Sequence, residues 1–159
     1  MSEIAIQDLL PENHCFGCGP LNPEGLQIKS FWSGESETIC TYQPESKHAA
    51  GPTHILNGGV IATLIDCHCI CTAVAEAYRR EGRDVGEPPM IWYATGSLTV
   101  RYLKPTFLKN PVVLRATIQE VKEKKTKLIC SVFSEEVKTA EGDVLAVRVP
   151  LSWRESPQS

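Results

Sequence analysis

The chain shows two hydrophobic periods, one after the other. Between residues 58 and 80, apolar side chains recur at helical spacing and cover most of the circumference of a helix, which predicts a helix enclosed by other elements. After residue 97 the period changes from 3.6 to 2, which is typical of strands. Alternating runs occupy 98–102, 112–118, 127–135 and 143–153, and two shorter strands are expected at 26–31 and 37–42.

The ends of these elements can also be predicted. Asn57 precedes the helical run and has the short side chain of a helix N-cap, while Gly82 and the turn-forming run 86–89 end it. The later strands are joined by the short segments 104–111, 120–125 and 139–142, too short for parallel crossovers. The predicted fold class is therefore α+β, with a curled antiparallel β-sheet wrapped around one long central α-helix.

Composition narrows the class of protein. The 159 residues, 42% of them apolar, are enough for one hydrophobic core and fit one domain. We expect an N-terminal loop region at 1–24, a core at 25–153 and a tail at 154–159. The 16 basic and 19 acidic residues give a formal net charge of −3, which argues against nucleic acid as a partner.

Cysteine usage and the N-terminus predict a cytoplasmic protein. Seven cysteines cannot all pair, and their spacing shows no disulfide framework, so a reducing compartment is expected. Residues 1–10 lack the basic and apolar blocks of a signal peptide. The apolar run 58–77 contains Asp66, His68 and Glu76, which are costly in hydrocarbon, so we expect a buried helix and no membrane contact.

Two segments carry a family resemblance. They are His54-Ile-Leu-Asn-Gly-Gly-Val-Ile-Ala-Thr-Leu-Ile-Asp66 and Thr95-Gly-Ser-Leu-Thr-Val-Arg-Tyr-Leu-Lys-Pro105. With the order of elements, they resemble the hotdog-fold thioesterase superfamily, in its PaaI-like acyl-CoA thioesterase branch, over about residues 24–153. That branch usually has His-Gly-Gly, six residues and then a catalytic carboxylate. The resemblance implies a homo-oligomer, a dimer or a dimer of dimers, that hydrolyses acyl-CoA without a cofactor.

Asp66 is the main candidate for catalysis. A carboxylate in an apolar helix is disfavoured unless its site is polar or useful, so Asp66 is a candidate general base or nucleophile. The structural alternative is a buried Asp bonded to Thr63. By resemblance, the Gly58 N–H polarises the thioester carbonyl, and Gly59 lets substrate approach the backbone closely.

The spacing of these groups creates a geometric difficulty. Eight residues of helix separate Gly58 from Asp66 by roughly 12 Å, too far for both to contact one thioester. The resemblance implies a solution, in which the helix N-terminus of one subunit faces the carboxylate of another. Thr95 matches a position where the family often places a hydroxyl beside the carboxylate, although threonine is also common in strands.

The motif departs from the family pattern at two positions. Asn57 stands where His is usual, and Gly51 where many members have Asn or Gln. Asn57 can still cap the helix or bond a carbonyl, and His54 or His48 could supply the missing polar group. Two other functions therefore stay open. The first is a hotdog dehydratase or hydratase that pairs His54 with Asp66, and the second is a non-catalytic acyl-CoA binder.

The helix also carries cysteines and a histidine. His68 points about 200° away from Asp66, so the two form no dyad within one chain, and we expect His68 to pack in the helix–sheet or dimer interface. Cys67, Cys69 and Cys71 are interpreted as small buried residues of the core.

The N-terminal loop contains His14, Cys15 and Cys18, which form half of a zinc-site pattern. No second pair of ligands has a recognisable spacing, although Cys40 or His48 could come near, so no metal is expected. By resemblance, this loop packs near the substrate channel. Basic residues are available for coenzyme A phosphates, and none is singled out among Arg79, Arg80, Arg83, Arg101, Lys104 and Lys109.

Overall fold

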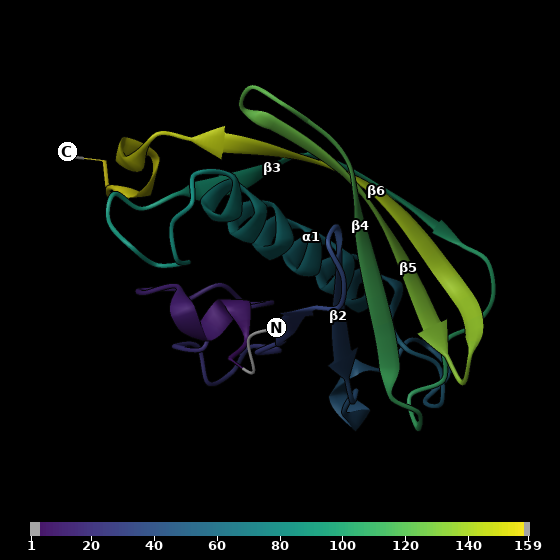
Figure 1. The fold of residues 1–159 in the computed structure, drawn as a ribbon. Helices are drawn as coiled ribbons and strands as arrows, with labels where there is room; N and C mark the ends of the chain where they lie inside the picture. The colour runs from purple at the N-terminus through teal and green to yellow at the C-terminus, as the bar shows by residue number, and fades with distance from the viewer. Residues whose placement is uncertain (1–3, 158–159) are drawn as a thin grey trace.

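The computed structural model describes residues 4–157. Six antiparallel strands form a sheet in the order β1-β2-β4-β5-β6-β3, which curls around the single long helix α1 (Figure 1). The predicted α+β arrangement is therefore confirmed. The elements are η1 (Ile6–Leu9), β1 (Ser30–Trp32), β2 (Glu37–Tyr42), η2 (Ser46–His48), α1 (Gly58–Arg80), β3 (Trp92–Tyr102), β4 (Val112–Lys122), β5 (Lys125–Ser134), β6 (Val137–Val149) and η3 (Leu151–Arg154).

Helix α1 begins and ends where the sequence predicts. Asn57 Oδ1 accepts hydrogen bonds from the backbone N–H groups of Gly59 at 2.7 Å and Val60 at 3.1 Å, which caps the first turn. Gly82 follows the last turn with φ of +67°. The helix is long and apolar enough to cross a membrane, but most of its residues between 61 and 78 are buried within this fold. Helix α1 is therefore the central helix of the fold, packed against the curled sheet.

The glycine at position 142 does not mark a turn, and the predicted connection at 139–142 is wrong. β6 runs through this segment, and Gly142 pairs with Val100 and Cys130 on the neighbouring strands. A Cβ at Gly142 would lie 2.6 Å from Cγ2 of Ile65, so the missing side chain lets the helix pack directly on the sheet. The actual turn lies at Glu135 and Glu136, with φ of 50° and 67°.

Several strand boundaries also differ from prediction, and because β4 ends at Lys122 and β5 begins at Lys125, the connection predicted at 120–125 is only residues 123–124. The segment 26–31 is strand only from Ser30, because Gln27 adopts a left-handed φ of 51° and Ile28 N–H donates to Gly17 in the N-terminal loop. β3 begins at Trp92 rather than 98. The last strand covers 137–149 rather than 143–153, because Pro150 lacks the N–H that a continued ladder needs.

A buried polar network joins α1 to β1 and β2. His68 Nδ1 lies 2.7 Å from Ser30 Oγ, and His68 Nε2 lies 3.2 Å from Thr38 Oγ1. Gln7 donates to Ser30 Oγ at 2.8 Å, and the hydroxyls of Thr38 and Thr72 lie 2.6 Å apart. The predicted packing of His68 in the helix–sheet interface is confirmed. Burial lowers its pKa to about 4, so the imidazole is neutral.

Candidate active site

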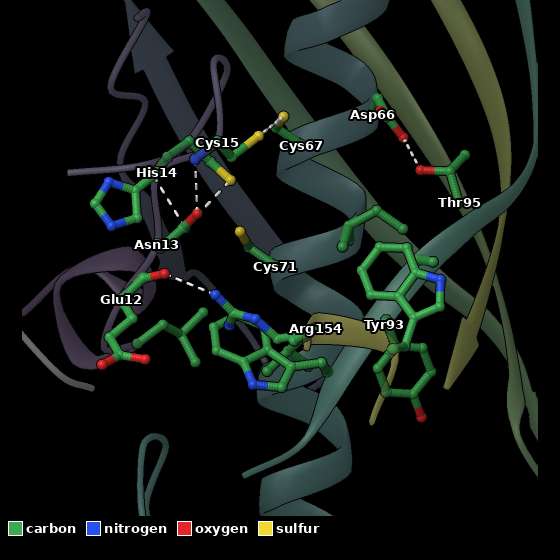
Figure 2. Close-up of a pocket in the computed structure, with 17 residues that line it drawn as sticks. Glu12, Asn13, His14, Cys15, Asp66, Cys67, Cys71, Tyr93, Thr95 and Arg154 are labelled. Carbon is green, nitrogen blue, oxygen red and sulfur yellow. Dashed lines mark hydrogen bonds between the residues drawn. The ribbon is translucent and has the colours of Figure 1, made fainter. Parts of the chain in front are cut away.

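A cavity of about 580 Å³ lies between α1, the first residues of β3, the N-terminal loop and η3. Its walls are mostly apolar, and Asp66, Thr95, Cys15, Cys67 and Arg154 are among the polar or reactive side chains that reach it (Figure 2). It therefore provides a mostly apolar pocket with a small number of chemical groups, which is typical of a small-molecule site.

Asp66 and Thr95 are in direct contact. Thr95 Oγ1 donates a hydrogen bond of 2.5 Å to Asp66 Oδ1, and a β-bulge between Thr95 and Ser97 interrupts the regular strand at this point. Thr63, the partner expected in the structural alternative, does not bond Asp66, because Thr63 Oγ1 donates to the Gly59 carbonyl instead. Burial raises the pKa of the half-buried Asp66, whereas the hydrogen bond from Thr95 lowers it.

The turn at Gly58 lies outside this cavity. Asn57 uses its side chain to cap Gly59 and Val60, and within residues 4–157 the Gly58 N–H has no acceptor. Tyr102 donates from its hydroxyl to the Gly58 carbonyl at 2.6 Å, which holds the turn against β3. Gly58 and Asp66 lie at different positions along α1, and the single chain does not bring them to one pocket.

The loop histidines lie away from Asp66. His54 is exposed and stacks on Phe107, with ring centroids 6.2 Å apart and an interplanar angle of 19°. His48 is buried, and its Nδ1 accepts from the Glu45 N–H at 3.0 Å. Gly51 is exposed. Neither histidine lines the cavity of Asp66.

One wall of the cavity, formed by Arg154 and Trp92, was not predicted from the sequence. Arg154 lies over the ring of Trp92 at 3.6 Å from the centroid, and it donates to the Glu12 carbonyl at 2.6 Å. Arg154 thus joins η3 to the N-terminal loop and closes this side of the cavity (Figure 2). No periodic pattern marks these residues, because they meet only through the tertiary fold.

The N-terminal loop brings its cysteines to α1. The Sγ atoms of Cys15, Cys18 and Cys67 all lie within 4.8 Å of one another, with 3.6 Å between Cys15 and Cys67. Among the residues that the structure describes, neither Cys40 nor His48 belongs to this group. Cys69 and Cys71 are buried in the core, as predicted.

The candidate arginines take part in ion pairs. Glu76 receives the guanidinium groups of Arg79 and Arg80 at 2.7 and 2.8 Å, and Arg101 pairs with Asp143 at 2.6 Å. These contacts fix the side chains on the outside of the fold and single out none for phosphate binding.

The family model of the thioesterase superfamily matches residues 53–141, and the chain belongs to this superfamily. A thioesterase superfamily protein from Shewanella loihica is 31% identical, with a TM-score of 0.65 over 87% of this chain and 96% of that chain. The Escherichia coli PaaI protein has a TM-score of 0.63 at 13% identity, covering 79% of this chain and 81% of its own, which shows the same fold. The predicted hotdog fold and superfamily are thus confirmed.

A curated relative is more distant. The acyl-coenzyme A thioesterase THEM4 of Rattus norvegicus is 25% identical over 128 residues, which cover 80% of this chain and 49% of that protein. The chain therefore spans about half the length of this relative.

Proposed function

We propose that this chain is an acyl-CoA thioesterase, in which the Asp66 carboxylate of one subunit acts with the Gly58 N–H of another. The observation that carries the proposal is the half-buried Asp66, which lies at the wall of an apolar cavity and is oriented by Thr95. Membership of the thioesterase superfamily and the similarity to THEM4 support thioester hydrolysis as the reaction.

The ionised carboxylate can act in either of two ways. As a general base, Asp66 takes a proton from water, the resulting hydroxide attacks the thioester carbonyl, and coenzyme A leaves as the thiol after receiving that proton. As a nucleophile, it attacks the carbonyl itself, the C–S bond breaks, and coenzyme A leaves as a thiolate that takes a proton from solvent; water then hydrolyses the resulting anhydride to the free acid and the Asp66 carboxylate. In both cases negative charge develops on the carbonyl oxygen, where one backbone donor typically contributes about 3 to 4 kcal/mol.

A second copy is needed to complete this site. The Gly58 N–H is free of the helix cap within the described chain, but it does not face the cavity of Asp66. Strand β3, which carries Thr95, is an edge strand of 11 residues with a largely exposed C-terminal half. An exposed edge has unpaired N–H and C=O groups that can pair with another chain. We propose that two copies dock along this edge.

The alternative functions differ in what they require. A dehydratase or hydratase that pairs His54 with Asp66 gains no support within one chain, because His54 stacks on Phe107 outside the cavity. A non-catalytic acyl-CoA binder would be stabilised by ligand without releasing thiol.

The test is a free-thiol release assay with short, long and aromatic acyl-CoAs, run on the parent protein and on Asp66→Asn. We expect turnover by the parent and a loss of about 10³-fold or more in Asp66→Asn, as for other removed catalytic bases and nucleophiles. The melting temperature and oligomeric state should be unchanged, because Thr95 can still donate to the amide oxygen. Equal turnover by the two proteins, or thermal stabilisation by acyl-CoA without thiol release, would contradict the proposal.

A further inference from the structure

The cysteine cluster beside the cavity has no role in the proposed hydrolysis. It joins a Cys-x-x-Cys loop, Cys15 and Cys18, to a residue more than fifty positions later, Cys67 of α1. The three sulfurs lie within 4.8 Å of one another, and those of Cys15 and Cys67 are 3.6 Å apart. A tetrahedral zinc ion with Zn–S bonds of about 2.3 Å places its sulfurs about 3.8 Å apart. The cluster is thus close to the dimensions of such a site.

The loop backbone is shaped to present these sulfurs to the helix. Asn13 Oδ1 accepts from the Cys15 N–H at 3.0 Å, and Gly19 N–H donates to the Cys15 carbonyl at 2.8 Å, which closes a tight turn around the pair. A Cβ at Gly17, between the two cysteines, would lie only 2.3 Å from Cys67 Sγ. Only glycine therefore allows the loop to lie against that sulfur.

Cys71 provides a fourth sulfur. It follows Cys67 by four residues, so both lie on the same face of α1. The thiols of Cys15, Cys67 and Cys71 all lie within hydrogen-bonding reach of the Cys18 thiol. In Figure 2 the His14 ring is turned away from the sulfurs, and Asp66 points to Thr95. Cys71 lies outside the three sulfurs that are within 4.8 Å of one another, and it joins them through its contact with Cys18 to give four cysteine donors.

We propose that Cys15, Cys18, Cys67 and Cys71 bind one Zn²⁺ in a tetrahedral thiolate site. Cys-x-x-Cys is the usual spacing of a zinc-binding pair, and the second pair comes from one face of a helix. Each thiol releases its proton to solvent as its sulfur binds the metal. The site ties the N-terminal loop to α1 and so fixes one wall of the cavity, with no part in the proton transfers at Asp66.

Other cysteines of this chain show what purely structural packing looks like. Cys69 is buried deep in the core, and its thiol bonds that of Cys130 on β5. Cys40 of β2 is likewise buried in the core. Cys71 also lies outside the group of three close sulfurs, but its thiol hydrogen-bonds that of Cys18, whereas the thiol of Cys69 hydrogen-bonds that of Cys130. Cys69 is therefore a matched control, since it lies on the same helix between the two proposed ligands.

The experiment measures metal in the full-length protein purified under reducing conditions without added chelator. We expect about one zinc per chain by elemental mass spectrometry. Replacement by Co²⁺ should give intense sulfur-to-cobalt charge-transfer bands and the visible bands of a tetrahedral site. Chelation should lower the melting temperature. None of these readouts depends on thioester hydrolysis, so the zinc site and the proposed function can fail separately.

Variants assign the ligands. Cys15→Ser and Cys71→Ser should lose most of the zinc and the tetrahedral cobalt spectrum, whereas Cys69→Ser should keep both. Cys15 is the exposed member of the cluster, so its variant tests the site even if a core substitution prevents folding. The proposal is wrong if the folded, reduced parent takes up neither zinc nor cobalt, if Cys15→Ser retains full metal, or if the cluster is found as a Cys15–Cys67 disulfide with no metal bound after reduction.

Discussion

At the scale of single residues, the contact between Thr95 and Asp66 determines how the carboxylate behaves. The hydroxyl donates to Asp66 Oδ1 at 2.5 Å and leaves the other carboxylate oxygen without a partner among the described residues. Burial raises the pKa of Asp66, and the Thr95 hydrogen bond works against this rise. Thr95 thus holds the carboxylate and favours its ionised form, and we propose that it is a positioning residue for the reaction.

Replacing Thr95 by Val should therefore slow hydrolysis and change its pH dependence. A hydrogen bond to a charged group contributes about 1.5 to 3 kcal/mol, so we expect kcat to fall by roughly 10- to 100-fold. In the proposed mechanism activity requires ionised Asp66, so activity should be lost as the pH falls through the pKa of this group. Without the Thr95 donor that pKa rises, and the acidic limb of the pH–rate profile should move to higher pH.

Thr95→Ser is the matched control, because it keeps the donor and should keep the position of the acidic limb. An unmoved limb in Thr95→Val would show that the hydroxyl does not act on the carboxylate.

At the scale of elements, α1 presents different chemistry on opposite faces. Asp66 and Cys67 both line the cavity, and Cys67 also contacts the N-terminal loop. The opposite face carries His68, which is fully buried against Ser30 of β1 and Thr38 of β2. Because Gln7 donates to Ser30 Oγ, the Ser30 hydroxyl can donate to His68 Nδ1, which leaves the proton of the neutral ring on Nε2.

This network predicts a loss of stability in mild acid. His68 has a folded-state pKa of about 4 against an ordinary 6.5, so between these values the unfolded chain binds a proton that the folded chain does not. The stability is complete above pH 6.5 and falls as the pH falls toward 4, by about 3 kcal/mol in total. Urea unfolding of the parent and of His68→Gln at several pH values measures this effect.

The glutamine variant lacks the titrating ring, so the stability advantage of the parent over His68→Gln should shrink by about 2 to 3 kcal/mol from pH 7.5 to pH 4.5. An advantage that is constant over this range would mean that His68 is not held neutral in the fold.

The elements that local patterns specify were the ones that could be predicted. The helical period and the capping side chain of Asn57 determine α1, and alternation determines the existence of the later strands. The turn predicted at Gly142 was wrong because this glycine is needed for close packing against Ile65 of α1. A contact between residues so far apart in the chain leaves no mark in the hydrophobic period. Contacts between distant residues are likewise invisible to local patterns. The Asp66–Thr95 contact was predicted only through the family resemblance, and the contact between Cys15 and Cys67 was not predicted.

At the scale of the whole molecule, the proposed active site requires two chains. Gly58 and Asp66 are on one helix but do not line one cavity. Asp66 contacts Thr95, which belongs to the long edge strand β3. In a symmetric pair, each site would combine the carboxylate of one subunit with the glycine turn of the other. The loss of either group in one subunit would then affect only the site to which that group belongs.

Gly58→Pro removes the proposed oxyanion donor with little strain. Proline is accepted at the first position of a helix, and Asn57 has the extended conformation, with φ −60° and ψ 134°, that a residue before proline adopts. A Cβ at Gly58 would lie 3.4 Å from the Tyr102 ring, an ordinary contact. Gly58→Ala is the control that keeps the N–H. The proline variant should lose roughly 10²- to 10³-fold in kcat, and the alanine variant far less.

The most direct measurement combines the two defects in one mixed dimer, with one subunit carrying Asp66→Asn and the other Gly58→Pro, isolated by two affinity tags. In that dimer one site has both defects and the other site has neither. If the two groups meet across subunits, this mixed dimer should release thiol at about half the rate of the wild-type dimer, although the Asp66→Asn and Gly58→Pro homodimers are each nearly inactive. A mixed dimer no more active than the two variant homodimers would contradict the claim that Asp66 and Gly58 meet across two subunits.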